Sequence, residues 1–347
     1  MIRNIATILL VFLSLTSLGQ KESRTKVLLL MGSRFELTAI SRNQENANKA
    51  IEAGITEIKR IEKLISSWDP NSQTSEIIRN AGIKPVIVDQ ELFNLIRRSI
   101  KVSELTHGAF DISYASMDKV WRFDGEMKQL PDSSVVAASV AKINYKNIIL
   151  NPDTRTVFLK DKGMKIGFGA IGKGYAANKA LDIMSKMNLG GALVNASGDL
   201  ISWGKNEDGK DWKVGIVNPK QKEKIFSWLN ISETAVVTSG NYEKFVKING
   251  ETYSHIIDPR TGYPVKGLSS VSIICPNAEL ADALATSVFV LGKEKGLELI
   301  NQLKGIECLL ITDKQELFTS KNLHLDYINK PIINHKYQIK IGNNHAK

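Results

Sequence analysis

The chain has 347 residues, of which 43% are hydrophobic and 24% are charged, a composition typical of a globular protein with one large domain or two modest ones. Its formal net charge of +10 raises the question of an anionic partner, but Lys and Arg are scattered, without a compact basic run or a stripe of interleaved aromatic residues. The sequence therefore argues against a nucleic-acid-binding protein and is compatible with a phosphate-bearing small ligand.

The N-terminal residues 1–20 have the layout of a secretory signal peptide. Arg3 precedes an apolar run over residues 5–13, and the small residues Ser17 and Gly19 follow where cleavage is expected. An uncleaved membrane anchor is the alternative, although the apolar run is short for a membrane span. No cysteine lies near the end of this segment, so the pattern excludes a lipoprotein. We predict an extracytoplasmic protein of the periplasm, either free or associated with the inner membrane.

The next part of the chain predicts strands followed by two helices. Residues 26–41 have an extended pattern with a break at Gly32. Residues 43–67 carry apolar side chains at helical spacing, and we expect this helix to end before Pro70, because proline disfavours helical geometry at the preceding residue. Asp89 is expected to cap a second helix.

Further along, residues 147–160 predict a hairpin that turns at Asn151-Pro152-Asp153. Residues 164–191 predict a strand, a glycine loop and a helix that ends at the Gly190-Gly191 pair. Short strands and turns then follow, until a helix is expected from about Ala278 to Leu291, with a further helix and strands after it.

The order of these elements indicates the fold class. There is no internal repeat, no low-complexity linker and no clear domain boundary, and strands and helices mix without regular βαβ alternation. The prediction is a single large α+β domain over residues 26–330, with mixed sheets packed against helices, and a C-terminal tail over residues 331–347. The two cysteines, Cys275 and Cys308, lie in apolar strand-like runs and are expected to be buried, with a disulfide between them left open.

Residues 167–174, GFGAIGKG, place a glycine loop before a helix. They match G-x-G-x-x-G, but the acidic residue that a dinucleotide-binding site needs after the next strand is absent at the required distance. They nearly match a P-loop, but Gly174 stands where that motif needs a Ser or Thr to bind magnesium. What remains is a helix N-terminus that favours phosphate oxygens through free N–H groups and the charge of Lys173, or simply a tight turn.

A carboxylate lies inside the last apolar helix. Between residues 280 and 292 the only polar side chains are Asp282, Thr286 and Ser287. The helix is therefore expected to be buried, and Asp282 to need a cation or several hydrogen-bond donors. Asp282 and Thr286 share one helix face, so their oxygens can share a magnesium ion. An Asp stabilised by the helix dipole beside an ordinary core threonine explains the pattern equally well.

The stretch SHIIDPRTGYP, Ser254 to Pro264, packs a histidine, an aspartate and an arginine between two strand-like runs. Its two prolines and Gly262 explain a turn. Turn chemistry does not explain His255, whose imidazole can accept a proton near neutral pH.

Four stretches, SHIIDPRTGYP, IGKGYAAN, ALVNASGDL and ADALATSVFVLG, together resemble the FAD:protein FMN transferases of the ApbE family. LMGSRFEL, SSWDPNS and THGAFDIS match the same pattern upstream, so the likeness covers nearly the whole chain after residue 30. The resemblance implies an ApbE-like, T-fold-like α+β domain. It also implies an enzyme that splits FAD with Mg²⁺, releases AMP and attaches FMN to a Thr or Ser hydroxyl of an acceptor flavoprotein, typically a subunit of a membrane redox complex.

The resemblance implies site residues by matching position. His255 would be the catalytic base, and Mg²⁺ would be bound by Asp282, Thr286 and the backbone carbonyl of Ala170. The residues expected to contact FAD are Met31, Trp68, Ala109, Phe110, Asp111, Lys173 and Ile257.

Some positions depart from the family pattern. Gly167 stands where the family commonly has Asp, and Asn178 and Asn241 stand where acidic residues are common. The residues after Asp111 also differ from the usual FDPTVGPL. One contact that a carboxylate makes in the family is therefore missing here or is supplied by another residue.

Two other functions fit the same residues. A metal-dependent FAD pyrophosphatase would use water in place of the acceptor hydroxyl and would give FMN and AMP. A periplasmic FAD-binding protein would lack catalysis, and the presence of His255, Asp282 and Thr286 argues against it. The sequence does not separate transfer from hydrolysis.

Overall fold

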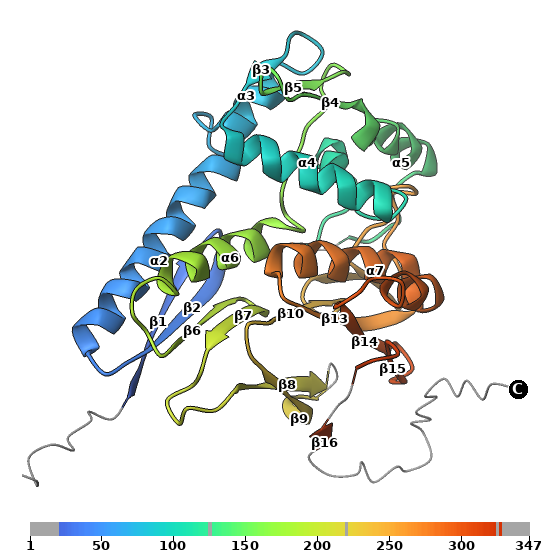
Figure 1. Cartoon of the computed structure of the whole chain (residues 1–347). Coiled ribbons are helices and arrows are strands. Elements are labelled where there is room, and N and C mark those ends of the chain that lie inside the picture. Colours follow the sequence, from blue (N-terminus) through green and yellow to red (C-terminus); the bar gives the residue numbers. More distant parts are fainter. Residues whose placement is uncertain (1–20, 124–126, 219–220, 324–325, 328–347) are drawn as a thin grey trace, which may run out of the picture.

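The computed structural model describes residues 21–123, 127–218, 221–323 and 326–327. Within them the chain forms one α+β domain built on an eight-stranded sheet (Figure 1). The predicted signal peptide and the predicted C-terminal tail lie outside the described residues. Among the described residues, no helix is both long enough and apolar enough to cross a membrane.

The main sheet has the strand order β1-β2-β6-β7-β10-β13-β14-β15. Its strands are β1 (Glu22–Leu30), β2 (Ser33–Ser41), β6 (Gly191–Ala196), β7 (Asp199–Gly204), β10 (Ala235–Gly240), β13 (Leu268–Cys275), β14 (Glu307–Thr312) and β15 (Leu317–Thr319). Every pair in it is antiparallel. Antiparallel neighbours do not need helical crossovers, and the α+β prediction is confirmed.

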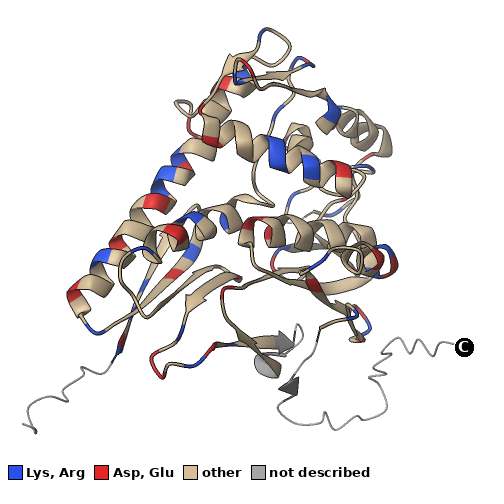
Figure 2. Cartoon of the chain, in the orientation of Figure 1, with Lys and Arg blue, Asp and Glu red and all other residues tan. Residues whose placement is uncertain are grey.

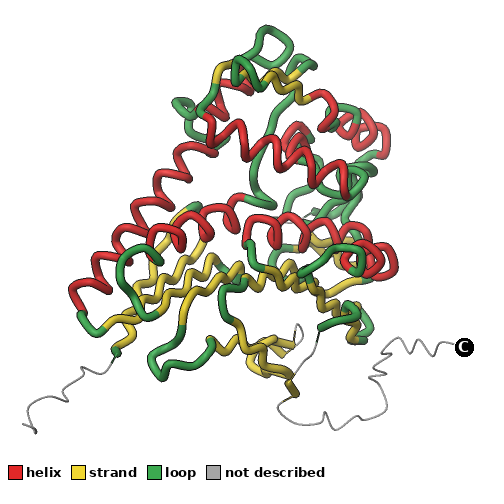
Figure 3. Tube along the Cα trace, in the orientation of Figure 1, coloured by secondary structure: helices red, strands yellow, loops and turns green. Residues whose placement is uncertain are grey.

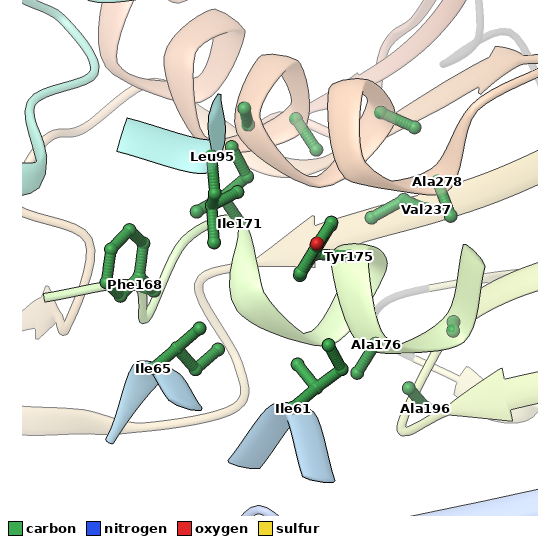
Figure 4. Packing of buried hydrophobic residues seen from close by; sticks show 14 of the residues in the cluster. Ile61, Ile65, Leu95, Phe168, Ile171, Tyr175, Ala176, Ala196, Val237 and Ala278 are labelled. Carbon is green, nitrogen blue, oxygen red and sulfur yellow. The ribbon is translucent and has the colours of Figure 1, made fainter. Parts of the chain in front are cut away.

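The helices cover one face of this sheet (Figure 3). The α-helices of the described chain are α2 (Gln44–Ile65), α3 (Gln73–Arg79), α4 (Gln90–Leu105), α5 (Ser133–Val140), α6 (Gly172–Met184) and α7 (Ala278–Ile300). α6 lies between α2 and α7 and packs against both. Figure 4 shows the core of this layer, where Ile61 of α2, Leu95 of α4 and Tyr175 of α6 face a common centre.

Smaller sheets surround the main one. A three-stranded sheet of β8 (Trp212–Asn218), β9 (Gln221–Ile231) and β16 (Asp326–Tyr327) covers the face opposite the helices, where Trp212 and Leu229 pack against Ile40 and Leu309. In another small sheet, β5 (Thr156–Leu159) lies between β3 (Val86–Ile87) and β4 (Ile148–Asn151). In the last, β11 (Phe245–Ile248) pairs with β12 (Glu251–Ser254). Two short 3₁₀ helices, η2 (Ile112–Ser116) and η3 (Tyr145–Asn147), complete the described elements.

Several local predictions are confirmed. β1 and β2 form a hairpin whose two turn residues, Met31 and Gly32, both have positive φ (51° and 67°). β4 and β5 form the predicted hairpin around Asn151. Cys275 and Cys308 are buried free thiols on neighbouring strands. The helix predicted from about Ala278 to Leu291 and the further helix after it are both present, because α7 begins at Ala278 and is broken into two helical parts at Gly292 (φ 78°, ψ 179°).

The predicted helix over residues 43–67 is α2, whose Asn43 side chain accepts hydrogen bonds from two N–H groups of the first turn. Basic and acidic residues are mixed along its exposed face (Figure 2). It ends at Ile65, earlier than Pro70 requires, and the Ser66 hydroxyl accepts hydrogen bonds from two N–H groups that follow. The hydrogen bonds of Ser66 therefore end α2 before Pro70 is reached, so the proline is not what ends the helix.

Three local predictions are wrong. Asp89 precedes α4, but its side chain makes no cap hydrogen bond and instead accepts one from Gln73 Nε2 at 2.7 Å. α6 ends at Met184, and Gly191 begins β6 where a Cβ would lie 2.0 Å from the carbonyl oxygen of Lys205. This glycine therefore permits a close backbone approach and does not end a helix. No strand forms over residues 164–168, which belong to none of the sheets in the described chain.

Candidate active site

Most of the predicted site residues line one cleft of about 460 Å³, within the usual size range of ligand pockets. The cleft lies where the first turns of α6 and α7 meet residues of β7 and β10 and the turn that follows β12. The predicted residues in its lining are Trp68, Ala109, Phe110, Asp111, Ala170, Lys173, His255, Ile257, Asp282 and Thr286. Residues more than two hundred positions apart in the sequence therefore share this cleft.

α6 and α7 meet at Gly174. A Cβ on this residue would lie 2.1 Å from the carbonyl oxygen of Ala278 and 2.8 Å from Cβ of Asp282, so the packing admits only glycine. The N–H of Gly174 donates a hydrogen bond to Oδ2 of Asp282 at 3.0 Å. One of the N–H groups expected to be free at this helix N-terminus thus holds a buried carboxylate.

Lys173 points to a second carboxylate. Its Nζ lies 2.5 Å from Oδ2 of Asp199, which is the first residue of β7 and is only 2% exposed. Burial raises the pKa of Asp199, and the charge of Lys173 offsets only part of this rise. Burial opposes the charge of Lys173, but Asp199 and Asp282 outweigh it and raise the pKa of the lysine. Lys173 is therefore a cation at neutral pH.

The oxygen donors at one end of the cleft fit a hard divalent cation. Asp282 is 4% exposed, and burial, followed by the charge of Asp199, raises its pKa, while the charge of Lys173 and the hydrogen bond from Gly174 offset only part of this rise. Thr286 lies one helical turn further along α7, and Ala170 lines the same cleft. A carboxylate, a hydroxyl and a backbone carbonyl are ligands that Mg²⁺ accepts, with water or phosphate in the remaining positions. The described residues contain no group of three or more His, Cys, Asp or Glu side chains for a metal, and this donor set, with one carboxylate, needs none.

His255 directly follows β12, at the start of the turn, and its side chain lines the cleft. Its backbone N–H donates to the carbonyl oxygen of Lys244 at 3.0 Å, and its Nδ1 lies 3.2 Å from the same oxygen. The tautomer protonated at Nδ1 donates to that oxygen and leaves Nε2 able to accept a proton. Burial and the nearby charges of Lys244 and Lys173 lower the pKa of His255, so the imidazole is neutral at neutral pH.

The turn after His255 is fixed from two sides. Arg260 binds both carboxylate oxygens of Asp258 at 2.8 Å, so this arginine holds the turn. Trp121 packs against Ile257 and donates its indole N–H to the carbonyl oxygen of Gly262 at 2.8 Å. The turn's charged pair is therefore structural, and His255 is the titratable side chain that this segment contributes to the cleft lining.

The residues expected to contact FAD differ in their surroundings. Ala109 and Phe110 are buried in the cleft wall, while Trp68 is 83% exposed and lies under the ammonium of Lys119 at 5.7 Å from its ring centre. Asp111 accepts hydrogen bonds from Ser113 and from the N–H of Tyr145, so its carboxylate braces the wall of the cleft. Burial raises the pKa of Asp111.

Met31 is the one predicted site residue outside the cleft lining. It lies in the β1–β2 turn, its N–H donates to Glu62 at 3.0 Å, and its side chain ends near Gly172. Met31 therefore contacts the glycine loop at Gly172 and does not line the cleft.

The departures from the family pattern have local structural explanations. A Cβ on Gly167 would lie 3.1 Å from Cβ of Ala115, which belongs to the segment after Asp111 that also departs from the pattern. Asn178 is the exception, because the hydrogen bond that it accepts from the N–H of Ala278 is one that an Asp would accept equally well. Asn241 donates to Asp313 Oδ1 and to a backbone carbonyl, which an Asp could not do.

Other cleft residues were not predicted from the sequence. They include Asp199, Thr238, Ser239 and Glu243. Asp199 lies too far after the glycine loop to be the ribose-binding acid of a dinucleotide site, and its spacing predicts no other role. The sequence signal that could have identified Asp199 is the Ser197-Gly198 pair directly before it, which is typical of a tight turn. In the structure both residues have positive φ (58° and 105°), and the turn fixes the backbone at this buried carboxylate. A second hollow, of about 530 Å³ at the start of α2, is lined by Arg42, Lys49 and their neighbours and contains none of the predicted site residues.

A family model described as the ApbE family matches residues 31–310, which include every predicted site residue. The chain belongs to the ApbE family. The resemblance that the motifs indicated is therefore confirmed.

Individual relatives of this ApbE-family chain agree. It is 31% identical over 301 residues to a FAD:protein FMN transferase of Klebsiella pneumoniae, covering 86% of this chain and 92% of the relative. It is 32% identical over 301 residues to a FAD:protein FMN transferase of Treponema pallidum, covering 82% of this chain and 83% of the relative. A crystal structure of the ApbE protein from Thermotoga maritima superposes with a TM-score of 0.79 at 28% identity, covering 86% of this chain and 97% of that one. The flavin transferase ApbE from Vibrio cholerae shares the fold, with a TM-score of 0.78 at 21% identity, covering 86% of this chain and 97% of that one.

Proposed function

We propose that this chain is a FAD:protein FMN transferase. It takes FMN from FAD, attaches it to a Thr or Ser hydroxyl of an acceptor flavoprotein and releases AMP. The names of its relatives support transfer of FMN from FAD to a protein. The observation that carries the proposal is the cleft itself, which is lined by a neutral imidazole at His255, a cation at Lys173 and the oxygen donors Asp282 and Thr286.

The reaction exchanges one phosphorus–oxygen bond for another. The acceptor hydroxyl attacks the phosphorus on the FMN side of the FAD pyrophosphate, and the bond from this phosphorus to the AMP phosphate oxygen breaks. AMP leaves with the electron pair of that bond, and the proton of the hydroxyl passes to Nε2 of His255. A neutral alcohol is a poor nucleophile, so a base within the cleft is needed as the attack proceeds.

The charged residues of the cleft suit a pyrophosphate. Lys173 supplies an ammonium at the first turn of α6, where the helix dipole also favours an anion. Asp282, Thr286 and the carbonyl of Ala170 would hold Mg²⁺, which, when bound, draws negative charge from phosphate oxygens and orients the displacement. The exposed ring of Trp68 at the edge of the cleft offers a flat surface on which a ring of FAD can stack.

Two further parts of the proposal concern where the reaction takes place. We infer export to the periplasm from the signal-peptide pattern of residues 1–20, with an uncleaved inner-membrane anchor as the alternative. The acceptor is then an extracytoplasmic domain, and a subunit of a membrane redox complex is the acceptor that the family resemblance favours.

The test is an acceptor-labelling experiment. The mature protein is incubated with FAD, Mg²⁺ and a candidate acceptor domain, and the acceptor is weighed by mass spectrometry. We expect a mass gain equal to FMN less one water, and free AMP in equal amount. Release of both FMN and AMP without labelling, across a set of Thr- and Ser-bearing acceptors, would favour the alternative FAD pyrophosphatase. FAD binding with no turnover at all would favour a non-catalytic binding protein.

His255→Ala separates the role of the base from that of the binding site. We expect FMN transfer to fall by about 10²- to 10⁴-fold, the usual contribution of general acid–base catalysis, while FAD affinity measured by flavin fluorescence stays unchanged. A variant that transfers FMN at the wild-type rate would contradict the proposed mechanism.

A further inference from the structure

The cleft holds one flexible cation between carboxylates. Lys173 pairs with Asp199 at 2.5 Å, and the residue after it, Gly174, donates its N–H to Asp282. The ammonium of Lys173 and the carboxylate of Asp282 are therefore close neighbours on two helices in contact. Asp282 is a proposed ligand of the metal ion, so some other residue must keep the ammonium of Lys173 from pairing with the Asp282 carboxylate.

Asp199 is the rigid member of this group. It is the first residue of β7 and pairs across the sheet with Ala196 on one side and Val237 on the other. Its backbone is therefore set by two neighbouring strands, and its side chain is 3% exposed. A carboxylate buried to this degree needs a cation, and Lys173 is the side chain that provides it.

Lys173 is the adaptable member. Its ammonium lies at the end of a flexible chain of four methylene groups, and its side chain is 28% exposed. The ammonium can therefore reach more than one partner. Without Asp199, the nearest buried negative charge for this ammonium is Asp282, because Gly174 holds that carboxylate against the first turn of α6. An ammonium paired with Asp282 would compete with a metal ion for the same oxygens.

We propose that Asp199 is a positioning residue, which holds the ammonium of Lys173 so that the carboxylate of Asp282 remains available to the metal ion. This inference rests on the proposed metal site. It goes beyond that site because it gives the Lys173–Asp199 ion pair a task in metal binding in addition to binding of FAD.

The test is a double-mutant cycle read by metal binding and not by turnover. Mn²⁺ serves as the probe, and its dissociation constant is measured by electron paramagnetic resonance for the wild type, Asp199→Asn, Lys173→Met and the double variant, with and without FAD. We expect Asp199→Asn to weaken Mn²⁺ binding by about tenfold, a middle value for coupled residues in contact. Lys179→Met is the matched control, since Lys179 lies on the same helix, outside the cleft lining, and pairs with Glu91 at 3.4 Å.

The cycle separates restraint of Lys173 from a simple charge effect. Removing a positive charge near the metal raises Mn²⁺ affinity in any case, so the informative quantity is the gain from Lys173→Met in each background. We expect this gain to be about tenfold larger in the Asp199→Asn background than in the wild type, because only there does Lys173 occupy Asp282. Equal gains in both backgrounds would overturn the inference, and so would unchanged Mn²⁺ binding in Asp199→Asn.

Two further measurements guard against other outcomes. Asp199→Asn removes one member of a buried ion pair, which destabilises the fold, so Asp199→Glu is measured in parallel. It keeps a partner for the lysine, and Mn²⁺ affinity should stay within about threefold of the wild type, whereas a tenfold loss would overturn the inference. A wild-type chain that binds no Mn²⁺ would overturn the proposed metal site and this inference with it, which distinguishes that failure from a failure of the role of Asp199 alone.

Discussion

Replacing Gly174 with alanine tests the contact on which the cleft is built. The new Cβ would lie 2.1 Å from the carbonyl oxygen of Ala278, 2.7 Å from its carbonyl carbon and 2.8 Å from Cβ of Asp282. Two of these atoms are backbone, so α6 and α7 must move apart to admit the methyl group. Overpacking of this kind costs about 1–3 kcal/mol. The separation also weakens the hydrogen bond from Gly174 to the buried carboxylate of Asp282, and losing a hydrogen bond to a charged group costs about 1.5–3 kcal/mol.

Gly174→Ala is therefore expected to lower the free energy of unfolding by about 2.5–6 kcal/mol, a large share of the stability of a typical domain. Urea unfolding followed by circular dichroism measures this. Gly169→Ala is the matched control in the same loop, because a Cβ there meets no atom within 4 Å and φ is not in the left-handed region. We expect the control to change stability by less than about 1 kcal/mol. If both variants unfold at the same urea concentration, the contact between the two helices is not tight and the reasoning fails.

Three other predictions concern the site and its support. The pKa of His255 is lowered below the ordinary 6.5, so the neutral base persists at neutral pH, and the rate of FMN transfer should fall only as pH drops below 6.5; an acid limb centred above pH 7 would contradict this. Thr286→Val should raise the Mg²⁺ concentration for half-maximal transfer by about tenfold or more, whereas Ser287→Ala, which removes a hydroxyl bonded to the Ala283 carbonyl, should leave it unchanged. Trp121→Phe keeps an aromatic ring but loses the hydrogen bond to Gly262, and urea unfolding should show a loss of about 1 kcal/mol; an unchanged midpoint would show that the indole N–H does not hold the turn.

Local patterns in the sequence predicted local structure well. The apolar stripe of residues 43–67 became α2, because one face of a helix at this spacing must be buried. The apolar surroundings of Asp282 predicted a buried carboxylate with a hydrogen-bond donor, and the structure supplies that donor at Gly174. In both cases the information lies within a few turns of one helix.

Contacts between distant segments could not be predicted in this way. The partner of Lys173 is 26 residues away and the donor to Asp282 is 108 residues away, and nothing in the local pattern specifies either pairing. The Gly190-Gly191 pair predicts a helix end because glycine is common there, but Gly191 is needed for close approach to the backbone of Lys205, a contact that the sequence does not reveal. Glycine marks a constraint in each case, and only the packing shows which one.

The break at Gly292 divides α7 into two parts, of which only the first contributes residues to the cleft. Its φ of 78° and ψ of 179° belong to a region of backbone conformation that is essentially open only to glycine. The part before the break carries Asp282 and Thr286, whereas the part after it carries no cleft residue. Insertions or substitutions that rotate residues 293–300 would therefore be absorbed at Gly292 without turning the donor face of the first part. A single glycine thus separates the orientation of the second part of α7 from that of the part that carries Asp282 and Thr286.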